Sequence, residues 1–127
     1  MREIKFMAYI KHLKLLVDVD VVDFLEEEIE VTIEGDMHVY RFDEIELLQF
    51  TGLKDKNGEE IYEGDIVEGF YHVPFSSELR KAVCYVAWDR SGYWTYKGER
   101  DFTAGYLTDL KDQQVIGNIY ENPDLLE

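Results

Sequence analysis

Cysteine is nearly absent from this chain, and the one that is present lies in a segment typical of a strand. Cys84 is the only cysteine, so no disulfide can form within the chain. Its neighbours Ala82, Val83, Tyr85 and Val86 suit a buried strand, and no nearby sequence feature lowers the pKa of a thiol. We therefore predict an inert thiol in the core rather than a reactive one.

Long apolar runs are also missing. No stretch approaches the roughly 20 apolar residues that a membrane-spanning helix needs. The first residues carry charges at Arg2, Glu3 and Lys5, and the apolar segment of a signal peptide does not follow them. The sequence therefore predicts no contact with a membrane and a cytoplasmic location.

Positive charge is scarce. The chain has 13 Lys and Arg against 28 Asp and Glu, which gives a net charge of −15. A phosphate backbone would be repelled, and binding to it needs clusters of Lys and Arg that this sequence lacks. We therefore predict no direct binding of nucleic acid. The acidity has two interpretations that stay open: solubility alone, or an acidic face for a basic host or phage protein, including mimicry of nucleic acid.

What the chain does contain points to one β-rich domain. Its 127 residues are 46% hydrophobic, which is enough for a single core. The aromatic share is 14%, and aromatic residues favour strands. We predict one domain over residues 1–127, in which residues 1–45 form N-terminal strands and residues 46–127 form a barrel-like core.

The N-terminal strands follow from alternation of apolar and polar residues. Residues 1–9 predict a first strand, and the segment from Val17 to Val22 predicts another, with Asp18 and Asp20 on one face. The cleanest alternation runs over residues 29–33, and a turn at 34–36 joins it to 38–42 as a hairpin. Residues 43–48 predict a short helical turn capped by Asp43, or a direct lead into the next strand.

The segment Leu48–Val67 is the most specific part of the chain. Asn57-Gly58 is a dipeptide that accepts positive φ at both central positions of a tight turn, and Glu63-Gly64-Asp65 predicts a second turn. Strands follow at 65–73, 82–88 and 93–96, and a closing strand at 114–120 has a bulge or a close backbone approach at Gly117. Residues 97–103 are predicted to be irregular, and 104–110 to form a helical turn or a bridging strand. The order of elements predicts a mainly β fold with little helix: a small SH3-like barrel or pseudo-barrel with an N-terminal β-meander.

Three stretches of this sequence resemble a known family. They read MREIKF at the start, LLQFTGLKDKNGEEIYEGDIV from Leu47, and VIGNIYENPDLL from Val115. They closely resemble the YopX-like family of small phage and prophage proteins, over nearly the full length. The resemblance implies a mainly β fold, a phage or prophage origin and a location inside a bacterial host cell. It brings no activity and no catalytic residues, and Met7–Ile10 departs from the Arg and Trp-Asp of the usual family opening.

No set of residues in the sequence predicts catalysis. Asp18 with Asp20, or Glu63 with Asp65, are carboxylate pairs without the further ligands of a metal site or the environment of an acid–base pair. The histidines also lack metal-ligand spacing and a nucleophile; they are His12, His38 and His72. We predict no catalytic, metal or cofactor site, and a metal-dependent hydrolase remains an alternative.

Binding is better supported than catalysis, because one predicted loop carries aromatic residues. The loop at 75–81 lies beside Phe70, Tyr71 and Phe75, and loops carry binding more often than strands do. These three residues are the predicted partner contacts, with core or edge packing as the alternative. The sequence therefore predicts a non-enzymatic protein-binding module with an acidic surface. The other alternative is a structural protein that assembles into homo-oligomers through exposed strand edges.

Overall fold

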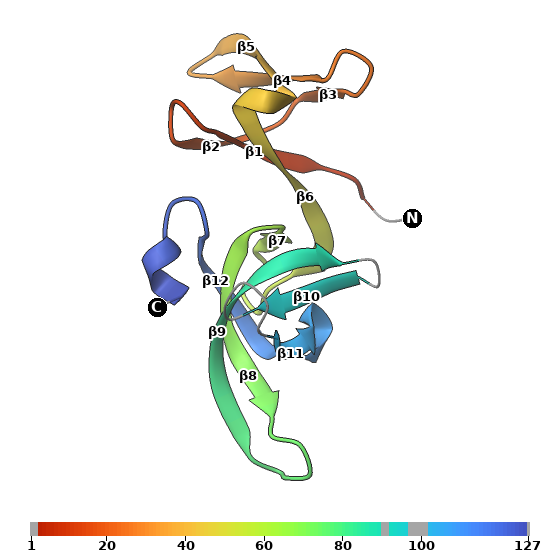
Figure 1. Cartoon of the computed structure of the whole chain (residues 1–127), viewed down its shortest axis with the longest axis vertical. Helices are drawn as coiled ribbons and strands as arrows, with labels where there is room; N and C mark the ends of the chain where they lie inside the picture. The colour runs from red at the N-terminus through yellow and green to blue at the C-terminus, as the bar shows by residue number, and fades with distance from the viewer. Residues whose placement is uncertain (1–2, 90–91, 97–101, 127) are drawn as a thin grey trace. The chain divides into compact units, whose positions relative to one another are not determined.

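The computed structural model describes residues 3–89, 92–96 and 102–126, and this part of the chain is mainly β (Figure 1). Its strands form three antiparallel sheets, and its helical segments are single 3-10 turns. The chain divides into two compact units, Met1–Phe50 and Thr51–Glu127. The prediction of a mainly β fold with little helix is confirmed. The single domain with an internal boundary near residue 45 stays a prediction.

The N-terminal unit begins with a strand that has a partner on each side. Strand β1 (Phe6–Ile10) pairs with β2 (Leu15–Asp18) and with β6 (Ile45–Lys54). Ala8 and Ile10 alternate toward the core and are fully buried. The predicted first strand is confirmed, although it starts later than the sequence indicated. The core of this unit consists of Ala8, Ile10, Ile29, Val31 and Ile45.

A second sheet of the N-terminal unit has the order β3-β4-β5. The strands are β3 (Val21–Asp23), β4 (Glu28–Ile33) and β5 (Asp36–Arg41). Glu34 and Gly35 both have positive φ, 51° and 85°, which is the geometry of a type I′ hairpin turn. Pairing runs without a register shift from Ile33 with Asp36 to Glu28 with Arg41. The predicted hairpin is confirmed.

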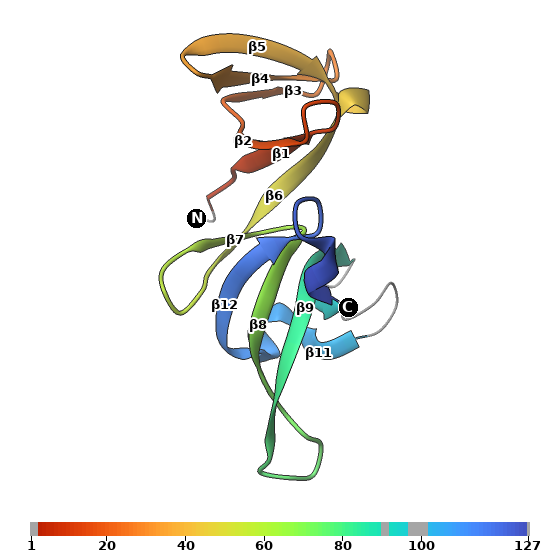
Figure 2. The ribbon, with the colours of Figure 1, turned by 90° about the vertical axis from the view of Figure 1, so that its left-hand side faces the viewer.

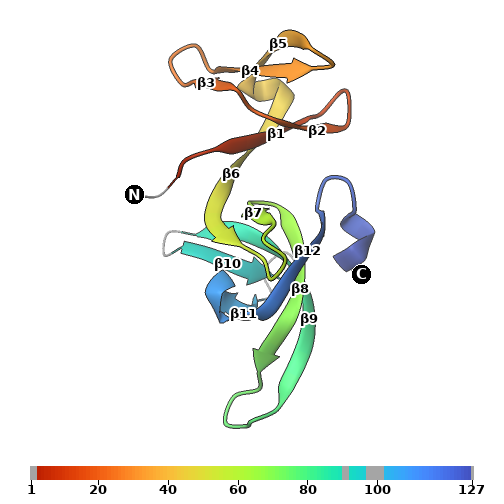
Figure 3. The same ribbon diagram turned by 180° about the vertical axis from the view of Figure 1, so that it is seen from behind.

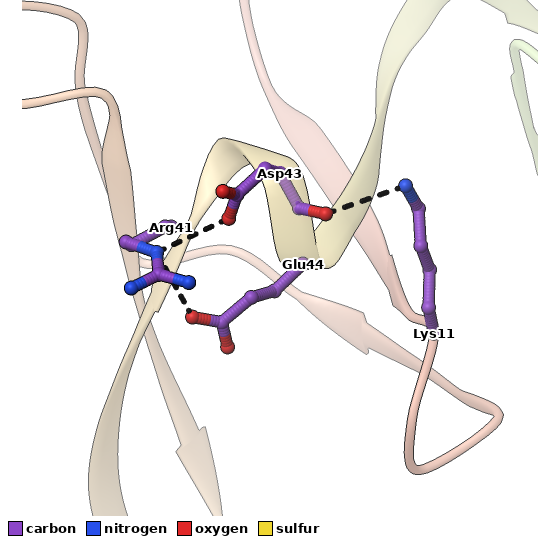
Figure 4. Close-up of polar contacts among 4 residues, drawn as sticks. All are labelled: Lys11, Arg41, Asp43 and Glu44. Carbon is purple, nitrogen blue, oxygen red and sulfur yellow. Dashed lines mark hydrogen bonds and ion pairs between the residues drawn. The ribbon is translucent and has the colours of Figure 1, made fainter.

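The segment after β5 is a single 3-10 turn, η1 (Phe42–Glu44), and strand β6 starts at the next residue. The predicted cap at Asp43 is wrong, because the N-cap position belongs to Arg41 and no side chain caps it. Asp43 lies inside the turn and accepts a hydrogen bond from Arg41 Nε at 3.1 Å instead (Figure 4). Both predicted outcomes, a short turn and a direct entry into a strand, thus occur in succession.

The C-terminal unit is built on a five-stranded antiparallel sheet with the order β11-β10-β9-β8-β12, which curls into a half-barrel (Figure 2). Strand β6 is not part of this sheet and is hydrogen-bonded to β7 (Glu60–Tyr62) instead. The likeness to an SH3 barrel stays a prediction. The elements are β8 (Asp65–His72), β9 (Leu79–Asp89), β10 (Gly92–Tyr96), β11 (Phe102–Tyr106), η2 (Leu107–Asp109), β12 (Lys111–Asn118) and η3 (Pro123–Leu126).

Two further predictions are tested by β11 and β12. The pairing of β12 with β8 shifts register between Val115 and Gly117, so the predicted bulge is confirmed. A Cβ at Gly117 would lie 2.6 Å from Oδ1 of Asn122, so what approaches this glycine closely is a side chain and not a backbone. The predicted irregular segment is wrong where it is described, since Phe102 and Thr103 belong to β11; residues 97–101 lie outside the described part.

The core of the C-terminal unit encloses the single cysteine. Cys84 is fully buried, and its Sγ lies 3.9 Å from the carbonyl oxygen of Val67, to which it donates. Burial raises the pKa of the thiol to about 11, against a smaller opposing effect of a hydrogen bond with Thr95. The predicted core position of this thiol is confirmed. The same core holds Ile61, Val67, Ala82, Val86, Tyr93, Leu107 and Leu110.

The loop between β6 and β7 is organised by Asp55 and not by a two-residue Asn-Gly turn. The predicted positive φ is confirmed at Gly58, at +83°, and is wrong at Asn57. The Oδ1 atom of Asp55 accepts the backbone N–H groups of Asn57 and Glu59, each at 2.9 Å. Its Oδ2 atom accepts the N–H of Val115 on β12, also at 2.9 Å. Asp55 thereby joins this loop to a strand 60 residues away.

Candidate functional site

Strands β8 and β9 extend past the other strands of their sheet as a two-stranded arm (Figures 1 and 3). The pairing of β12 with β8 ends at Phe70, and the described pairing of β10 with β9 ends at Tyr85. Beyond these points β8 and β9 continue to pair with each other as far as His72 with Leu79. We define the arm as residues 70–81. It carries all three residues that the sequence predicted as partner contacts.

Hydrogen bonds hold the tip of the arm in one conformation. Val73 donates its N–H to the carbonyl oxygen of Glu78 at 3.0 Å, and Ser76 donates its N–H to the carbonyl oxygen of Val73 at 3.1 Å. The Oγ atom of Ser76 in turn accepts the N–H of Glu78 at 3.0 Å. The predicted loop thus spans 73–78 and is shorter than expected, because β9 already begins at Leu79.

Phe75 lies at the tip with its side chain fully exposed, at 109% of the reference accessibility. Its φ is +61°, a left-handed conformation that is unfavourable for a residue with a Cβ. The tip therefore combines two unfavourable features, strained backbone and an aromatic ring in water.

Phe70 and Tyr71 are arranged differently from Phe75. Both are half-buried on β8, and Tyr71 packs against the core of the C-terminal unit. Tyr71 also faces Arg80 across the strand pair. Of the three predicted contacts, Phe75 offers the most accessible ring, while Tyr71 is held by the fold.

The arm is not acidic although the chain is, because residues 70–81 contain one acid, Glu78, against two bases, Arg80 and Lys81. Lys81 Nζ lies 3.2 Å from Glu68 Oε1, and Arg80 Nε lies 3.2 Å from Glu78 Oε1. The hydrogen bond with Glu78 raises the pKa of Arg80. The exposed aromatic tip is therefore not an acidic surface.

The acidity is concentrated elsewhere, in residues 18–36. This segment has nine Asp and Glu and no Lys, Arg or His, so it carries −9 of the net −15. It covers β3, β4 and the start of β5, the three-stranded sheet of the N-terminal unit. Within the described part of the chain, none of its nine acids forms an ion pair. They are Asp18, Asp20, Asp23, Glu26, Glu27, Glu28, Glu30, Glu34 and Asp36.

Comparison with known proteins settles the family. The family model described as YopX protein matches residues 5–127. The chain belongs to the YopX family. This confirms the resemblance that the three sequence stretches indicated.

A solved structure supports the same relationship. The crystal structure of protein EF1440 from Enterococcus faecalis is 27% identical to this YopX chain, with a TM-score of 0.63 and coverage of 100% of both chains. No curated protein matches the chain. The helices in the described part are single turns, and none has the length and apolarity that a membrane crossing requires.

The first carboxylate pair considered for this YopX chain, Asp18 and Asp20, does not lie on one strand. Strand β2 ends at Asp18 and β3 begins at Val21, so the predicted common strand face for Asp18 and Asp20 is wrong. Oδ2 of Asp20 instead accepts the hydroxyl of Thr32 at 2.8 Å. The predicted strand is interrupted because the chain turns between two different sheets.

The second carboxylate pair includes one strongly perturbed acid. Burial raises the pKa of Asp65 to about 7, against the hydrogen bond from the N–H of Tyr62. The negative charges of Glu59 and Asp55 add to the rise. The hydrogen bond from the N–H of Tyr62 to Oδ2 of Asp65, at 2.8 Å, spans the turn at residues 62–65. Asp65 therefore has a structural role in this turn.

The raised pKa predicts a pH-dependent contribution of Asp65 to stability. The folded chain holds this proton more tightly than the unfolded chain, so the contribution of Asp65 to stability is largest below pH 4 and falls as the pH rises toward and through about 7. Asp65→Asn keeps an oxygen for the Tyr62 N–H and cannot titrate. Relative to the unsubstituted chain, we expect it to gain up to about 4 kcal/mol between pH 4 and pH 8. Urea unfolding of both chains at pH 4 and pH 8 measures their difference in the free energy of unfolding. The same difference at both pH values would contradict the prediction.

Two of the three histidines, His12 and His38, lie beside an aromatic ring. The ring of Tyr40 lies 5.7 Å from that of His12 and 6.2 Å from that of His38, while His72 is exposed at the end of β8. No group of three or more His, Cys, Asp or Glu in the described residues could hold a metal ion. The prediction of no catalytic, metal or cofactor site stays a prediction.

Proposed function

We propose that this YopX protein is a phage- or prophage-encoded accessory protein that works by binding another protein in the bacterial cytoplasm, without enzymatic activity and without a cofactor. The observation that carries the proposal is Phe75. A fully exposed aromatic ring held on a hydrogen-bonded tip is the kind of anchor that fills a pocket on a partner. Family membership and the bacterial source of the related structure are consistent with the proposed origin and location.

The backbone of Phe75 strengthens the proposal. Strained residues persist where the surrounding structure holds them, and they cluster at sites that bind or switch. Glycine would adopt φ +61° without strain, and the ring makes up no part of either core. The fold therefore does not need phenylalanine at this position, which leaves contact with a partner as its use.

We expect Phe75→Gly to leave the fold intact and to remove binding. The free energy of unfolding should stay the same or rise by up to about 1 kcal/mol, because a left-handed residue loses its Cβ. Affinity capture of the tagged chain from bacterial lysate, followed by mass spectrometry, should recover a partner that the Phe75→Gly chain loses. Capture at low and high salt should give the same partner for this site, since the exposed anchor, Phe75, is an uncharged ring.

Ser77→Ala is the matched control, because it changes an exposed side chain of the same loop without removing apolar surface. It should retain the partner. If the unsubstituted chain, Phe75→Gly and Ser77→Ala all recover the partner equally, the proposed role of the tip is wrong. A loss of stability in Phe75→Gly would show that the ring supports the fold instead.

A further inference from the structure

We propose that Asn57 is a site of spontaneous covalent modification, at which the backbone nitrogen of Gly58 attacks the side-chain amide and water completes its conversion to aspartate and isoaspartate. The site lies in the loop between β6 and β7 and uses no residue of the arm. The inference is therefore independent of the proposed function.

The reaction needs only this dipeptide and water. The nitrogen of Gly58 gives up its proton to solvent and forms a bond with Cγ of Asn57, while the side-chain amide nitrogen takes up a proton and leaves as ammonia. The product is a cyclic succinimide. Water then adds to either ring carbonyl carbon and breaks the bond of that carbon to the ring nitrogen, which gives isoaspartate or aspartate. Asparagine is among the thermolabile residues of proteins for this kind of reason.

Both reacting groups are accessible in the folded chain. Asn57 and Gly58 are exposed. The backbone N–H of Asn57 donates to Oδ1 of Asp55, but within the described part of the chain no hydrogen bond holds its side-chain amide. Glycine has no Cβ to hinder its nitrogen, and the place that a Cβ would take at Gly58 has nothing within 4 Å. Neighbouring atoms therefore leave room for the ring to close.

The other two asparagines of the chain lack these features. Asn118 is buried, and its side chain accepts the N–H groups of Tyr120 and Glu121 and donates to Oε1 of Glu121. Asn122 precedes Pro123, whose nitrogen carries no hydrogen, and its Oδ1 accepts the N–H of Asn118 at 3.3 Å. Reaction is therefore expected at Asn57 and not at these two positions.

The fold slows the reaction without blocking it. Gly58 donates its N–H to the carbonyl oxygen of Asp55 at 3.0 Å, and the attacking nitrogen has to leave this bond. A single backbone hydrogen bond of this kind lowers the rate by up to about tenfold. Oδ1 of Asp55 also holds the N–H groups of Asn57 and Glu59 on either side of the glycine. The rate therefore depends on how firmly Asp55 holds the loop.

Modification removes contacts that organise this loop. In the succinimide the nitrogen of residue 58 carries no hydrogen, so its bond to the carbonyl oxygen of Asp55 is lost. Isoaspartate adds an extra carbon to the main chain between the N–H groups of residues 57 and 59, which share Oδ1 of Asp55. Both products also add a negative charge to a loop that already holds Asp55 and Glu59. Because Asp55 accepts the N–H of Val115 as well, ageing weakens the link to β12.

The test is incubation of the full-length chain at pH 8 in water enriched in heavy oxygen, followed by digestion and mass spectrometry. We expect two chromatographically separate products at Asn57, both carrying the heavy oxygen atom, which distinguishes them from products formed during digestion. A synthetic peptide of residues 54–61 should react up to about tenfold faster. An unmodified Asn57 in the folded chain after the peptide has reacted fully, or equal modification at Asn118, would overturn the proposal.

Two substitutions test the chemistry. Asn57→Gln requires a larger ring and should give no product over the same period. Gly58→Ala places a Cβ beside the attacking nitrogen, so Asn57 should react about tenfold more slowly. Equal rates in Gly58→Ala and in the unsubstituted chain would show that this nitrogen is not the nucleophile.

Variants of Asp55 test the restraint on the loop. Asp55→Ala removes the acceptor that the N–H groups of Asn57 and Glu59 share, so Asn57 should react nearly as fast as in the peptide. The amide oxygen of Asp55→Asn replaces this acceptor and should keep the rate close to that of the unsubstituted chain. Equal rates in all three chains would contradict the restraint.

Urea unfolding of aged protein provides a test that does not depend on whether Asp55→Ala folds. Ageing at pH 8 should lower the urea midpoint of the unsubstituted chain and leave that of Asn57→Gln unchanged. The same loss in both chains would show that modification of Asn57 does not loosen the loop.

Discussion

Asp55→Ala should destabilise the C-terminal unit by about 3–5 kcal/mol. Asp55 is 6% exposed, and its carboxylate accepts three backbone N–H groups. Hydrogen bonds to a charged group contribute about 1.5–3 kcal/mol each, and an alanine leaves these three donors without their acceptor. The bond to the N–H of Val115 also joins the β6–β7 loop to β12, so the loss affects two distant segments.

The pKa of Asp55 gives this prediction a second readout. Burial alone would raise the pKa, but the N–H groups of Val115, Glu59 and Asn57 outweigh it, and the pKa is lowered. The stabilisation is therefore present above the unfolded pKa near 3.8 and is lost as the pH falls through the folded value. Asp55→Ala should show less acid destabilisation than the unsubstituted chain does.

Asp55→Asn is the matched control. Its amide oxygen can replace Oδ1 toward Asn57 and Glu59, but its NH₂ group cannot accept the N–H of Val115. We expect a loss roughly half of that in Asp55→Ala, measured by urea unfolding at pH 7. Equal stability of all three chains would contradict the role given to Asp55.

Gly69→Ala should destabilise the same unit by about 2–3 kcal/mol, for a steric reason. A Cβ at Gly69 on β8 would lie 2.7 Å from Cγ of Leu110 and 2.9 Å from the carbonyl oxygen of Lys111. The carbonyl belongs to the backbone of β12, so it cannot rotate away, and Leu110 is buried in the core. Overpacking of this kind costs about 1–3 kcal/mol.

Gly58→Ala separates this steric effect from the effect of φ. A Cβ at Gly58 would meet nothing within 4 Å, but the φ of this residue is +83°. The variant should lose only about 1 kcal/mol, through backbone strain. Thermal unfolding of both variants measures the difference. A loss in Gly69→Ala no larger than that in Gly58→Ala would show that the contact with Leu110 and Lys111 relaxes freely.

Local patterns predicted much of the fold. Alternation placed β4 and β5, and Gly117 marked the bulge in β12, because each signal depends on neighbouring residues alone. A positive φ at Asn57 was predicted wrongly because Asp55, a residue outside the dipeptide, organises the loop by accepting the N–H groups of Asn57 and Glu59. The pairing of Asp18 and Asp20 was wrong because the chain changes sheets between β2 and β3.

The candidate sites were predictable to different degrees. Phe75 was predicted from its loop and its aromatic neighbours, but its positive φ comes from the hydrogen bonds of the tip, which the residue types do not specify. The acid-only segment 18–36 can be read from the sequence, but the net charge of the whole chain does not show where the acids lie. That β5 is the last strand of its sheet follows from sheet order, which depends on pairing between distant segments.

The buried position of Cys84 has a practical consequence for measuring these effects. A thiol reagent can reach it only when the C-terminal unit opens, and both tryptophans, Trp88 and Trp94, belong to the same unit. Residues 1–50 contain neither cysteine nor tryptophan. Labelling kinetics and tryptophan fluorescence thus monitor the C-terminal unit and give no signal from the N-terminal unit, so Ala8→Cys at a buried position would give the N-terminal unit a thiol reporter of its own.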